Sequence, residues 1–184
     1  MASWTEFAAD EPQLAAAIRG LIQQYGPGMG YLATVRADGG PRVHPVSPVI
    51  TPDGLYCFIV DSPKRRDLER DGRYALHSFP PEDSDDEAYV AGRARPVTDR
   101  ARVAELAGEL RAAPHVDWRL FEFTVDVAMV ARRDGAGPPD ADLPGLSGAG
   151  APSGVPGGGP AVQVWLDPGA ATAERRSPLL SLSA

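Results

Sequence analysis

Three cations follow one another at positions 64 to 66, and their place at the start of a predicted helix is unusual. Ser62 and Pro63 are typical of an N-cap and a first helical position, so Lys64, Arg65 and Arg66 fall in the first turn. A helix N-terminus already carries partial positive charge, and added cations there are unfavourable by about 0.3 to 1 kcal/mol each. An anion reverses the sign of these terms, because free backbone N–H groups and a lysine ammonium both attract phosphate. The stretch therefore predicts a phosphate site.

Ion pairing within the helix is the alternative explanation for these charges. Arg65 and Glu69 are four residues apart, but with the cation first this pair is in the weaker orientation. Arg66 and Arg70 have the same spacing and repel each other. Arg42, at the start of a predicted strand, is a candidate second phosphate ligand, since a guanidinium can hold two phosphate oxygens at once. A solvated arginine at a strand end is the alternative interpretation of Arg42.

No arrangement of residues in the sequence is typical of a nucleophile with its base, or of a metal site, so the catalytic residues stay unknown. The histidines His44, His77 and His115 lie apart in the chain. His44 and His77 could still meet in space, with hydrogen-bonded structural histidines as the alternative. The acidic run at 82–87 lacks the spacing of a calcium loop and is expected to be a solvated loop. Cys57 lies in an apolar run and is expected to be a small buried side chain.

The first part of the chain predicts one helix and three strands. Asp10 and Gln13 have the spacing of a capping box, and apolar residues then recur with a helical period over 11–25. Short extended runs separated by turns predict strands at 31–37, 41–50 and 55–60. Prolines at positions 41, 45 and 48 remove donors from the second strand. That strand is therefore expected at a sheet edge or strongly bent, with its open side free for a ligand.

The middle of the chain predicts a short helix at about 63–70 and further strands. Runs at 73–79 and 88–97 are two of these strands, and Gly92 is expected at a bulge or a close backbone approach. Thr98 is the expected cap of an amphipathic helix over 98–112. Alternating apolar and polar residues then predict one strand over 121–129. Its expected core face consists of Phe121, Phe123, Val125, Val127 and Met129.

Residues 1–132 are expected to form one domain that includes the N-terminal helix. The segment 133–160 is rich in glycine and proline without periodicity, which predicts a flexible linker. The run 161–167 is expected to return as a closing strand of the same domain, anchored by Trp165, before a disordered tail at 168–184. Strands without regular alternation with helices predict a mainly β protein, a six-stranded antiparallel β-barrel with peripheral helices.

The composition argues against several classes of function. A formal net charge of −7 does not favour the broad basic surface that binds nucleic acid or anionic membrane. No apolar run has the length of a membrane span, and the first residues lack the pattern of a signal peptide. The single cysteine allows no disulfide within the chain, which fits a reducing compartment. We expect a cytoplasmic protein with a small-molecule substrate, and neither nucleic acid nor membrane as partner.

Three stretches of the sequence carry a resemblance to a known family. In chain order, "LATVRADGGPRVHPV", "DSPKRRDLERDGRYALH" and "AYVAGRARPV" resemble the pyridoxamine 5'-phosphate oxidase-like family of flavin-binding split barrels. The resemblance is most specific from about Gly28 to Val97 and extends more loosely from the first helix to Arg132. It implies a Greek-key split barrel that forms a homodimer, with flavin mononucleotide (FMN) in clefts at the subunit interface.

The resemblance also implies roles for single residues. Arg42 and Lys64 match phosphate-binding positions, and Pro63 stands where the vitamin-synthesising members have a basic residue, which leaves Arg65 as a replacement. The implied activity is that of an FMN-dependent oxidoreductase, with hydride transfer to or from an unknown small molecule. A reductase that uses a deazaflavin coenzyme, or a protein that binds flavin or haem without turnover, are the alternatives. The expected cofactor-binding residues are Arg42, Val43, His44, Pro45, Ser62, Lys64 and Arg65.

Overall fold

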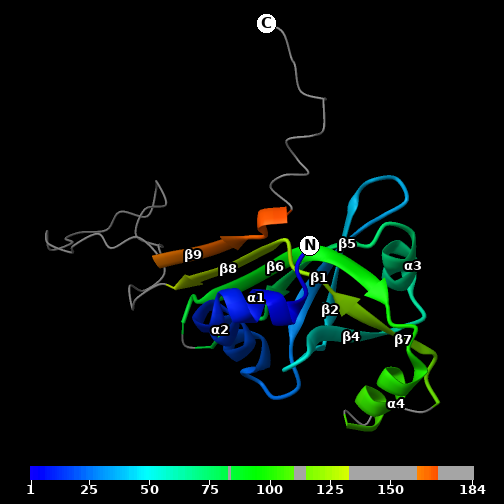
Figure 1. The fold of residues 1–184 in the computed structure, drawn as a ribbon. Helices are drawn as coiled ribbons and strands as arrows, with labels where there is room; N and C mark the ends of the chain where they lie inside the picture. The colour runs from blue at the N-terminus through cyan, green and yellow to red at the C-terminus, as the bar shows by residue number, and fades with distance from the viewer. Residues whose placement is uncertain (83, 110–114, 133–160, 170–184) are drawn as a thin grey trace, which may run out of the picture.

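The chain folds into a curled antiparallel sheet with helices around it (Figure 1). This computed structural model describes residues 1–82, 84–109, 115–132 and 161–169. The helices are α1 (Trp4–Asp10), α2 (Pro12–Gln23), α3 (Pro63–Arg70) and α4 (Arg100–Glu109). The strands are β1 (Gly30–Val35), β2 (Pro41–Val46), β3 (Pro48–Thr51), β4 (Gly54–Val60), β5 (Arg73–Ser78), β6 (Glu87–Pro96), β7 (Trp118–Phe123), β8 (Val127–Arg132) and β9 (Ala161–Leu166).

Strand β6 lies where two arms of the sheet meet. Its first half pairs with β5 and β8, and its last residues, from Ala94 to Pro96, pair with β7. One arm therefore has the order β2-β1-β5-β6-β8-β9, and the other has the order β6-β7-β4-β3. All strand pairs among the described residues are antiparallel. The predicted fold class, a mainly β split barrel with peripheral helices, is confirmed.

The described residues form nine strands because two of the six predicted runs are broken, and the closing strand adds one more. The run 41–50 is interrupted at Ser47, where β2 ends and β3 begins. These two strands lie at the two ends of the main strand order, so the proline-rich run does occupy sheet edges. The run 121–129 is interrupted at 124–126, between β7 and β8.

Gly92 explains how β6 can approach this second break. A Cβ atom at Gly92 would lie 2.1 Å from the carbonyl oxygen of Thr124, far closer than van der Waals contact allows. The expected close backbone approach at Gly92 is therefore confirmed. A glycine is required there because the chain that crosses from one arm to the other runs directly against β6.

The break at 124–126 also changes which side chains face the core. Phe121 and Phe123 are buried as predicted, and Val125 is buried within the break itself. In β8 the buried residues are Ala128, Val130 and Ala131, whereas Val127 and Met129 are only half-buried. The prediction of one continuous core face was wrong beyond Val125, since a strand keeps its alternation only while it remains unbroken.

Two helices occupy the N-terminal region, where one was predicted at 11–25. The capping box is formed by Ser3 and Glu6 at the start of α1, not by Asp10 and Gln13. Asp10 instead accepts a hydrogen bond from the indole of Trp165 at 2.8 Å. This contact ties β9 to the end of α1.

Strand β9 lies within the run where the closing strand was expected. Trp165 is buried and packs against Phe7, with 4.9 Å between the ring centroids. The predicted linker at 133–160 and the predicted tail from residue 170 onward lie outside the described residues.

Helix α4 begins two residues later than predicted. Its cap is Asp99 in place of Thr98, because the Asp99 carboxylate accepts from the N–H of Ala101 at 2.9 Å. The predicted end of this helix, at 110–112, lies outside the described residues. The main core packs α1 and α2 against the inner face of the sheet, while Leu106 of α4 closes a smaller cluster over β4 and β7. None of the described helices has the length and apolar character that crossing a membrane requires.

Candidate functional site

Helix α3 begins at Pro63 with Ser62 as its N-cap residue, as the sequence predicted. The Ser62 hydroxyl donates to the carbonyl of Val60 at 2.8 Å and makes no capping hydrogen bond to the helix. The first turn of α3 therefore has no side-chain cap from Ser62. An uncapped helix N-terminus is a favourable position for an anion.

Two of the three cations in this turn are already paired within the chain. Arg65 contacts the two carboxylate oxygens of Asp117 at 3.1 Å each, and it lies 3.1 Å from Asp61. Arg66 contacts Asp61 at 3.3 Å on the surface. The charges of Arg65 and Arg66 are therefore compensated within the chain, without an anion. The alternative pairing with Glu69 is not formed either, because Glu69 contacts Arg119 of β7.

Lys64 is the cation of this turn that has no ion pair among the described residues. Its side chain is half-buried, and its charge acts on His44 and Cys57. Burial, Lys64 and Arg42 together hold the pKa of His44 below its ordinary value, so the imidazole is neutral near pH 7. Burial raises the pKa of Cys57 to about 12, although Lys64 opposes this shift.

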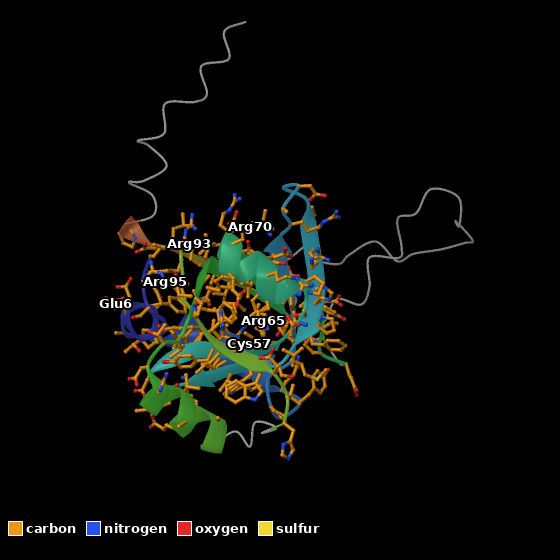
Figure 2. The ribbon with its side chains drawn as sticks, turned by 90° about the vertical axis from the view of Figure 1, so that its right-hand side faces the viewer. Glu6, Cys57, Arg65, Arg70, Arg93 and Arg95 are labelled. Atoms are coloured by element: carbon orange, nitrogen blue, oxygen red, sulfur yellow. The ribbon has the colours of Figure 1, made fainter. Side chains whose placement is uncertain are left out.

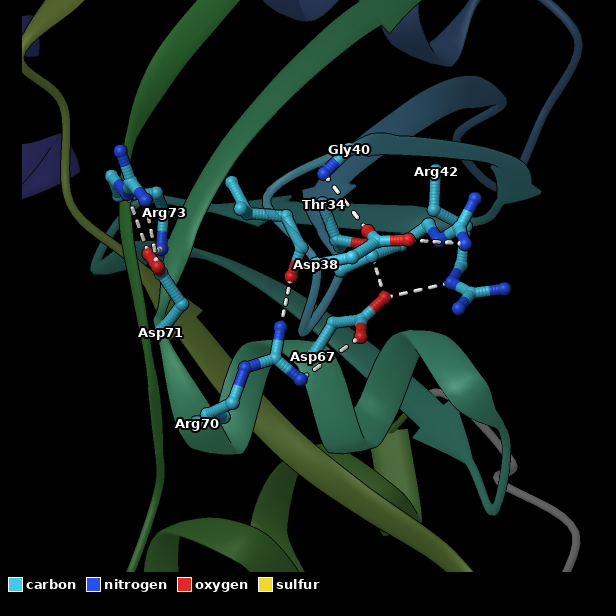
Figure 3. Close-up of polar contacts among 10 residues, drawn as sticks. Thr34, Asp38, Gly40, Arg42, Asp67, Arg70, Asp71 and Arg73 are labelled. Atoms are coloured by element: carbon cyan, nitrogen blue, oxygen red, sulfur yellow. Dashed lines mark hydrogen bonds and ion pairs between the residues drawn. The ribbon is translucent and has the colours of Figure 1, made fainter.

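Asp67 is a buried carboxylate that ties α3 to the hairpin of β1 and β2 (Figure 3). Its Oδ2 atom accepts from Nε of Arg42 at 2.7 Å and from the hydroxyl of Thr34 at 3.0 Å. Its Oδ1 atom accepts from Arg70 at 3.3 Å. Burial raises the pKa of Asp67, but the hydrogen bonds from Arg42, Thr34 and Arg70 outweigh it and hold the pKa below its ordinary value. The carboxylate is therefore charged in the folded protein.

A surface depression of about 500 Å³ opens beside this network, between α3 and the β1–β2 hairpin. Four arginines and two aspartates line it, which leaves an excess of positive charge in a chain whose formal net charge is −7. Two of these arginines, Arg66 and Arg70, come from the first and the last turn of α3, and Figure 2 labels Arg70. The charged lining consists of Arg36, Asp38, Arg42, Arg66, Asp67 and Arg70.

Strand β2 carries Arg42, Val43, His44 and Pro45, four of the expected cofactor-binding residues. Among the described strands β2 pairs only with β1, so its other edge is open. Val43 and Pro45 face outward, and Val43 is 59% exposed. Arg42 and His44 face the half-buried side. The Nε2 atom of His44 is buried and has no hydrogen-bond partner within the described part of the chain.

His44 and His77 do not meet, because they lie on opposite faces of the sheet. His44 is paired with Leu32, whereas His77 is paired with Tyr31, the neighbouring residue of β1. Residues directly opposite each other share a face and successive residues do not. His77 contacts Glu87 at 3.1 Å on the outer face, so the suggestion that the two histidines meet was wrong. His115 is exposed in the turn before β7.

The charges of Lys64 and Arg42 thus both act on His44, while Arg65 is turned toward Asp117. Sequence reasoning missed Asp67, which organises the arginines of the depression. One signal was available, since Asp67 lies three residues after Lys64 and three before Arg70, on neighbouring turns of the same helix.

The fold and this site define a class of protein, an antiparallel split barrel with a positively charged depression where a short helix meets the first hairpin. The family model described as Pyridoxamine 5'-phosphate oxidase matches residues 14–134. The chain therefore belongs to the pyridoxamine 5'-phosphate oxidase family. No curated protein matches it by sequence.

Several solved structures share the fold. A heme binding protein from Mycobacterium smegmatis is 20% identical, with a TM-score of 0.51 over 66% of this chain and 55% of that one. General Stress Protein 26 from Bacillus anthracis is 21% identical, with a TM-score of 0.51 over 62% of this chain and 91% of that one. HupZ from Group A Streptococcus is 18% identical, with a TM-score of 0.53 over 61% and 90%. At these identities the similarity establishes the fold, and this chain spans 55% of the mycobacterial protein.

Proposed function

We propose that the chain is a cytoplasmic FMN-dependent oxidoreductase that transfers hydride to or from a small molecule, with the flavin phosphate bound at the start of α3. The observation that carries the proposal is Lys64, a half-buried cation without an ion pair among the described residues. It lies beside a helix start without a side-chain cap and near a depression with excess positive charge. A phosphate dianion compensates the charge of Lys64, the helix start and the excess positive charge of the depression. Family membership makes a flavin the expected carrier of that phosphate.

Arg42 is the second phosphate ligand in this proposal. Asp67 engages its Nε atom, which leaves both terminal nitrogens for two phosphate oxygens. Ser62 lies at the same helix start, where its hydroxyl can rotate from Val60 toward a ligand. Arg65 has to release Asp117 before it reaches the same phosphate, so we assign it a smaller share of the binding energy.

The open edge of β2 is the proposed contact for the flavin ring. Val43, His44 and Pro45 present a free backbone edge there, beside the neutral imidazole of His44. Bound flavin supplies the hydride chemistry, while the chain binds and orients it. A dedicated acid or base is not required for hydride transfer of this kind, which agrees with the separate positions of the histidines.

A homodimer belongs to the proposal because the outer face of the longer arm carries exposed apolar side chains from β2 to β9. The residues of the main core that α1 and α2 cover lie on the opposite face. Val43 and Leu166 lie near the two ends of the outer face and are 59% and 58% exposed. A second copy that covers this face would also enclose the open edge of β2. One row of cross-strand neighbours on the outer face consists of Pro45, Tyr31, His77, Tyr89, Met129 and Val164.

The absorption spectrum of the purified protein is the first test. Flavin bands that survive desalting, or that return after incubation with FMN, support the proposal, and a protein that stays colourless in both cases contradicts it. Mass spectrometry of the released small molecule separates FMN from a deazaflavin coenzyme. Anaerobic mixing with NADH, NADPH or a reduced deazaflavin then separates an oxidoreductase from a protein that binds flavin without turnover.

Haem binding without turnover is the second candidate function. One protein of similar fold is a heme binding protein, and the neutral imidazole of His44 is the form that ligates iron. Haem propionates would then take the place of the phosphate among the arginines. A Soret band on titration with haemin, lost in His44→Ala, would support this candidate. The absence of a Soret shift in the wild-type protein would remove it.

A further inference from the structure

We infer that Asp67 is the positioning residue of the anion site, where it holds the guanidinium of Arg42 by its inner nitrogen so that the two terminal nitrogens face the ligand phosphate. Asp67 acts through Arg42 and Arg70 and does not itself bind the anion. The inference rests on the proposed function for the identity of the ligand. Inorganic phosphate as a probe makes the anion site testable without any flavin.

The contact between the two residues leaves the binding end of Arg42 free. Nε of Arg42 lies 2.7 Å from Oδ2 of Asp67, and Figure 3 shows the terminal nitrogens of Arg42 on the side away from the carboxylate. A guanidinium held in this way can grip two oxygens of one phosphate. An unrestrained arginine loses side-chain entropy when it becomes ordered on a ligand. Asp67 removes part of that cost before the ligand arrives.

Asp67 is itself fixed from both sides. It is 4% exposed, and its Oδ2 atom also accepts from the Thr34 hydroxyl of β1 at 3.0 Å. Its other oxygen accepts from Arg70, which also donates to the carbonyl of Val35. A buried carboxylate is tolerated only with such compensating partners. The network therefore sets the orientation of two arginines of the depression from one rigid point.

The charge of Asp67 and its positioning role act in opposite directions on an anion. A carboxylate beside the depression repels phosphate, so loss of that charge alone strengthens binding. Loss of the positioning contact weakens binding, because Arg42 and Arg70 are no longer held. The sign of the change in affinity therefore decides between the two effects.

The first experiment titrates inorganic phosphate into the full chain, with the arginine Nε–Hε NMR signals as readout. In Asp67→Asn the amide replaces one acceptor oxygen with a donor, so it cannot hold both Arg42 and Arg70. We expect phosphate affinity about tenfold below that of the wild type, equivalent to about 1.4 kcal/mol. Equal or tighter binding by Asp67→Asn overturns the inference.

Asp38→Asn is the matched control, because Asp38 lines the same depression and contacts Arg36 without contacting Arg42. We expect this variant to bind phosphate at least as tightly as the wild type. Thr34→Val removes one hydrogen bond to Asp67 without a change of charge, and we expect affinity about threefold weaker. An equal loss in Asp38→Asn and Asp67→Asn overturns the inference, and so does unchanged affinity in Thr34→Val.

The flavin experiment compares FMN with riboflavin, which lacks the phosphate. We expect Asp67→Asn to weaken FMN binding about tenfold and to leave riboflavin binding unchanged. A parallel loss for both flavins indicates a loosened fold and overturns the inference. In a double-mutant cycle, Asp67→Asn should weaken FMN binding no further once Arg42→Ala is present. Additive losses also overturn it.

The outcomes separate the inference from the proposed function. Phosphate binding that weakens as expected, in a protein that binds neither flavin, supports the positioning role and contradicts the flavin proposal. Flavin binding with normal phosphate affinity in Asp67→Asn supports the flavin proposal and overturns the positioning role.

Discussion

Arg65 and Asp117 form a bidentate ion pair that joins the first turn of α3 to the residue before β7. Each terminal nitrogen of Arg65 lies 3.1 Å from one carboxylate oxygen of Asp117, and the Arg65 side chain is only 14% exposed. The charge of Arg65, one of the three clustered cations, is therefore compensated within the chain. Lys64, which has no ion pair within the described residues, is left as the cation available to a ligand.

We expect Lys64→Ala to lower the affinity for FMN by roughly 1.5 to 3 kcal/mol, because one charge-assisted hydrogen bond to the phosphate is lost. Flavin fluorescence titration measures this change, and the melting temperature of the flavin-free protein should stay close to that of the wild type. Arg65→Ala is the control, with a smaller loss since Arg65 is paired with Asp117. Unchanged FMN affinity in Lys64→Ala would remove Lys64 from the site.

The same prediction can be tested without mutation, because Lys64 is the only lysine in the sequence. Reductive methylation with labelled formaldehyde marks Lys64 and the terminal amine alone and keeps the positive charge of lysine. We expect FMN to shift the Lys64 methyl signal and riboflavin to leave it in place. A signal that responds equally to both flavins would contradict a phosphate contact.

Gly92→Ala should destabilise the protein by about 3 kcal/mol or more, because the new Cβ would meet the Thr124 carbonyl at 2.1 Å. Gly92 lies in β6 and Thr124 lies between β7 and β8, so neither backbone can move away without disturbing the strand pairing. Urea unfolding measures the change in the free energy of unfolding. Gly108→Ala is the control, since nothing lies within 4 Å of a Cβ there and alanine favours the helix by about 1 kcal/mol. Equal stability of the two variants would contradict the close approach.

Cys57 should resist thiol reagents in the native protein. Its side chain is buried, and burial raises the pKa of the thiol to about 12, so the reactive thiolate is scarce at neutral pH. Alkylation with iodoacetamide near neutral pH, followed by mass spectrometry, should modify the protein only after denaturant is added. Rapid modification of the folded protein would contradict the burial of this residue.

The stability of the protein should fall in acid partly because of Asp71. Hydrogen bonds from Arg73 lower the pKa of Asp71 from its ordinary value of 3.8 to about 2. Because this pKa is lower in the folded state than in the unfolded state, the charged Asp71 stabilises the protein at pH values above 3.8. That stability is lost as the pH falls toward about 2. Because Arg73 is 58% exposed, the contribution is about 1 kcal/mol after screening by solvent. Asp71→Asn should have a lower urea midpoint than the wild type at pH of about 5 and the same midpoint at pH of about 2. The same difference in midpoint at both pH values would contradict this origin.

Val164→Asp should weaken the proposed homodimer, because it adds a charge to the apolar outer face of β9. Light scattering across a range of protein concentrations should detect the wild type as a dimer and the variant as a monomer at low concentration. Val116→Asp is the matched control, since Val116 is also exposed but lies in the turn before β7. If both variants keep the mass of the wild type, the interface lies elsewhere.

Much of the fold could be predicted from local patterns. Helix α3 begins at Pro63 as expected, because Ser62 and Pro63 act on the chain next to them. The break between β7 and β8 could not be predicted, since 124–126 alternates like a strand and turns only because β6 pairs with both sides. The same limit applies to the site, where Arg42 and Arg65 carry local signals but their partners come from other elements.

A mainly β protein with a cation-rich helix start follows from local patterns, because period, turn residues and capping residues act over a few positions. Which of those cations has an ion pair depends on contacts between distant parts of the chain. Asp117 is 52 residues beyond Arg65 and Asp67 is 25 beyond Arg42, so their pairing depends on how β7 and α3 are packed against the first hairpin. Charge is a property of a residue, whereas compensation of that charge is a property of the fold that surrounds it.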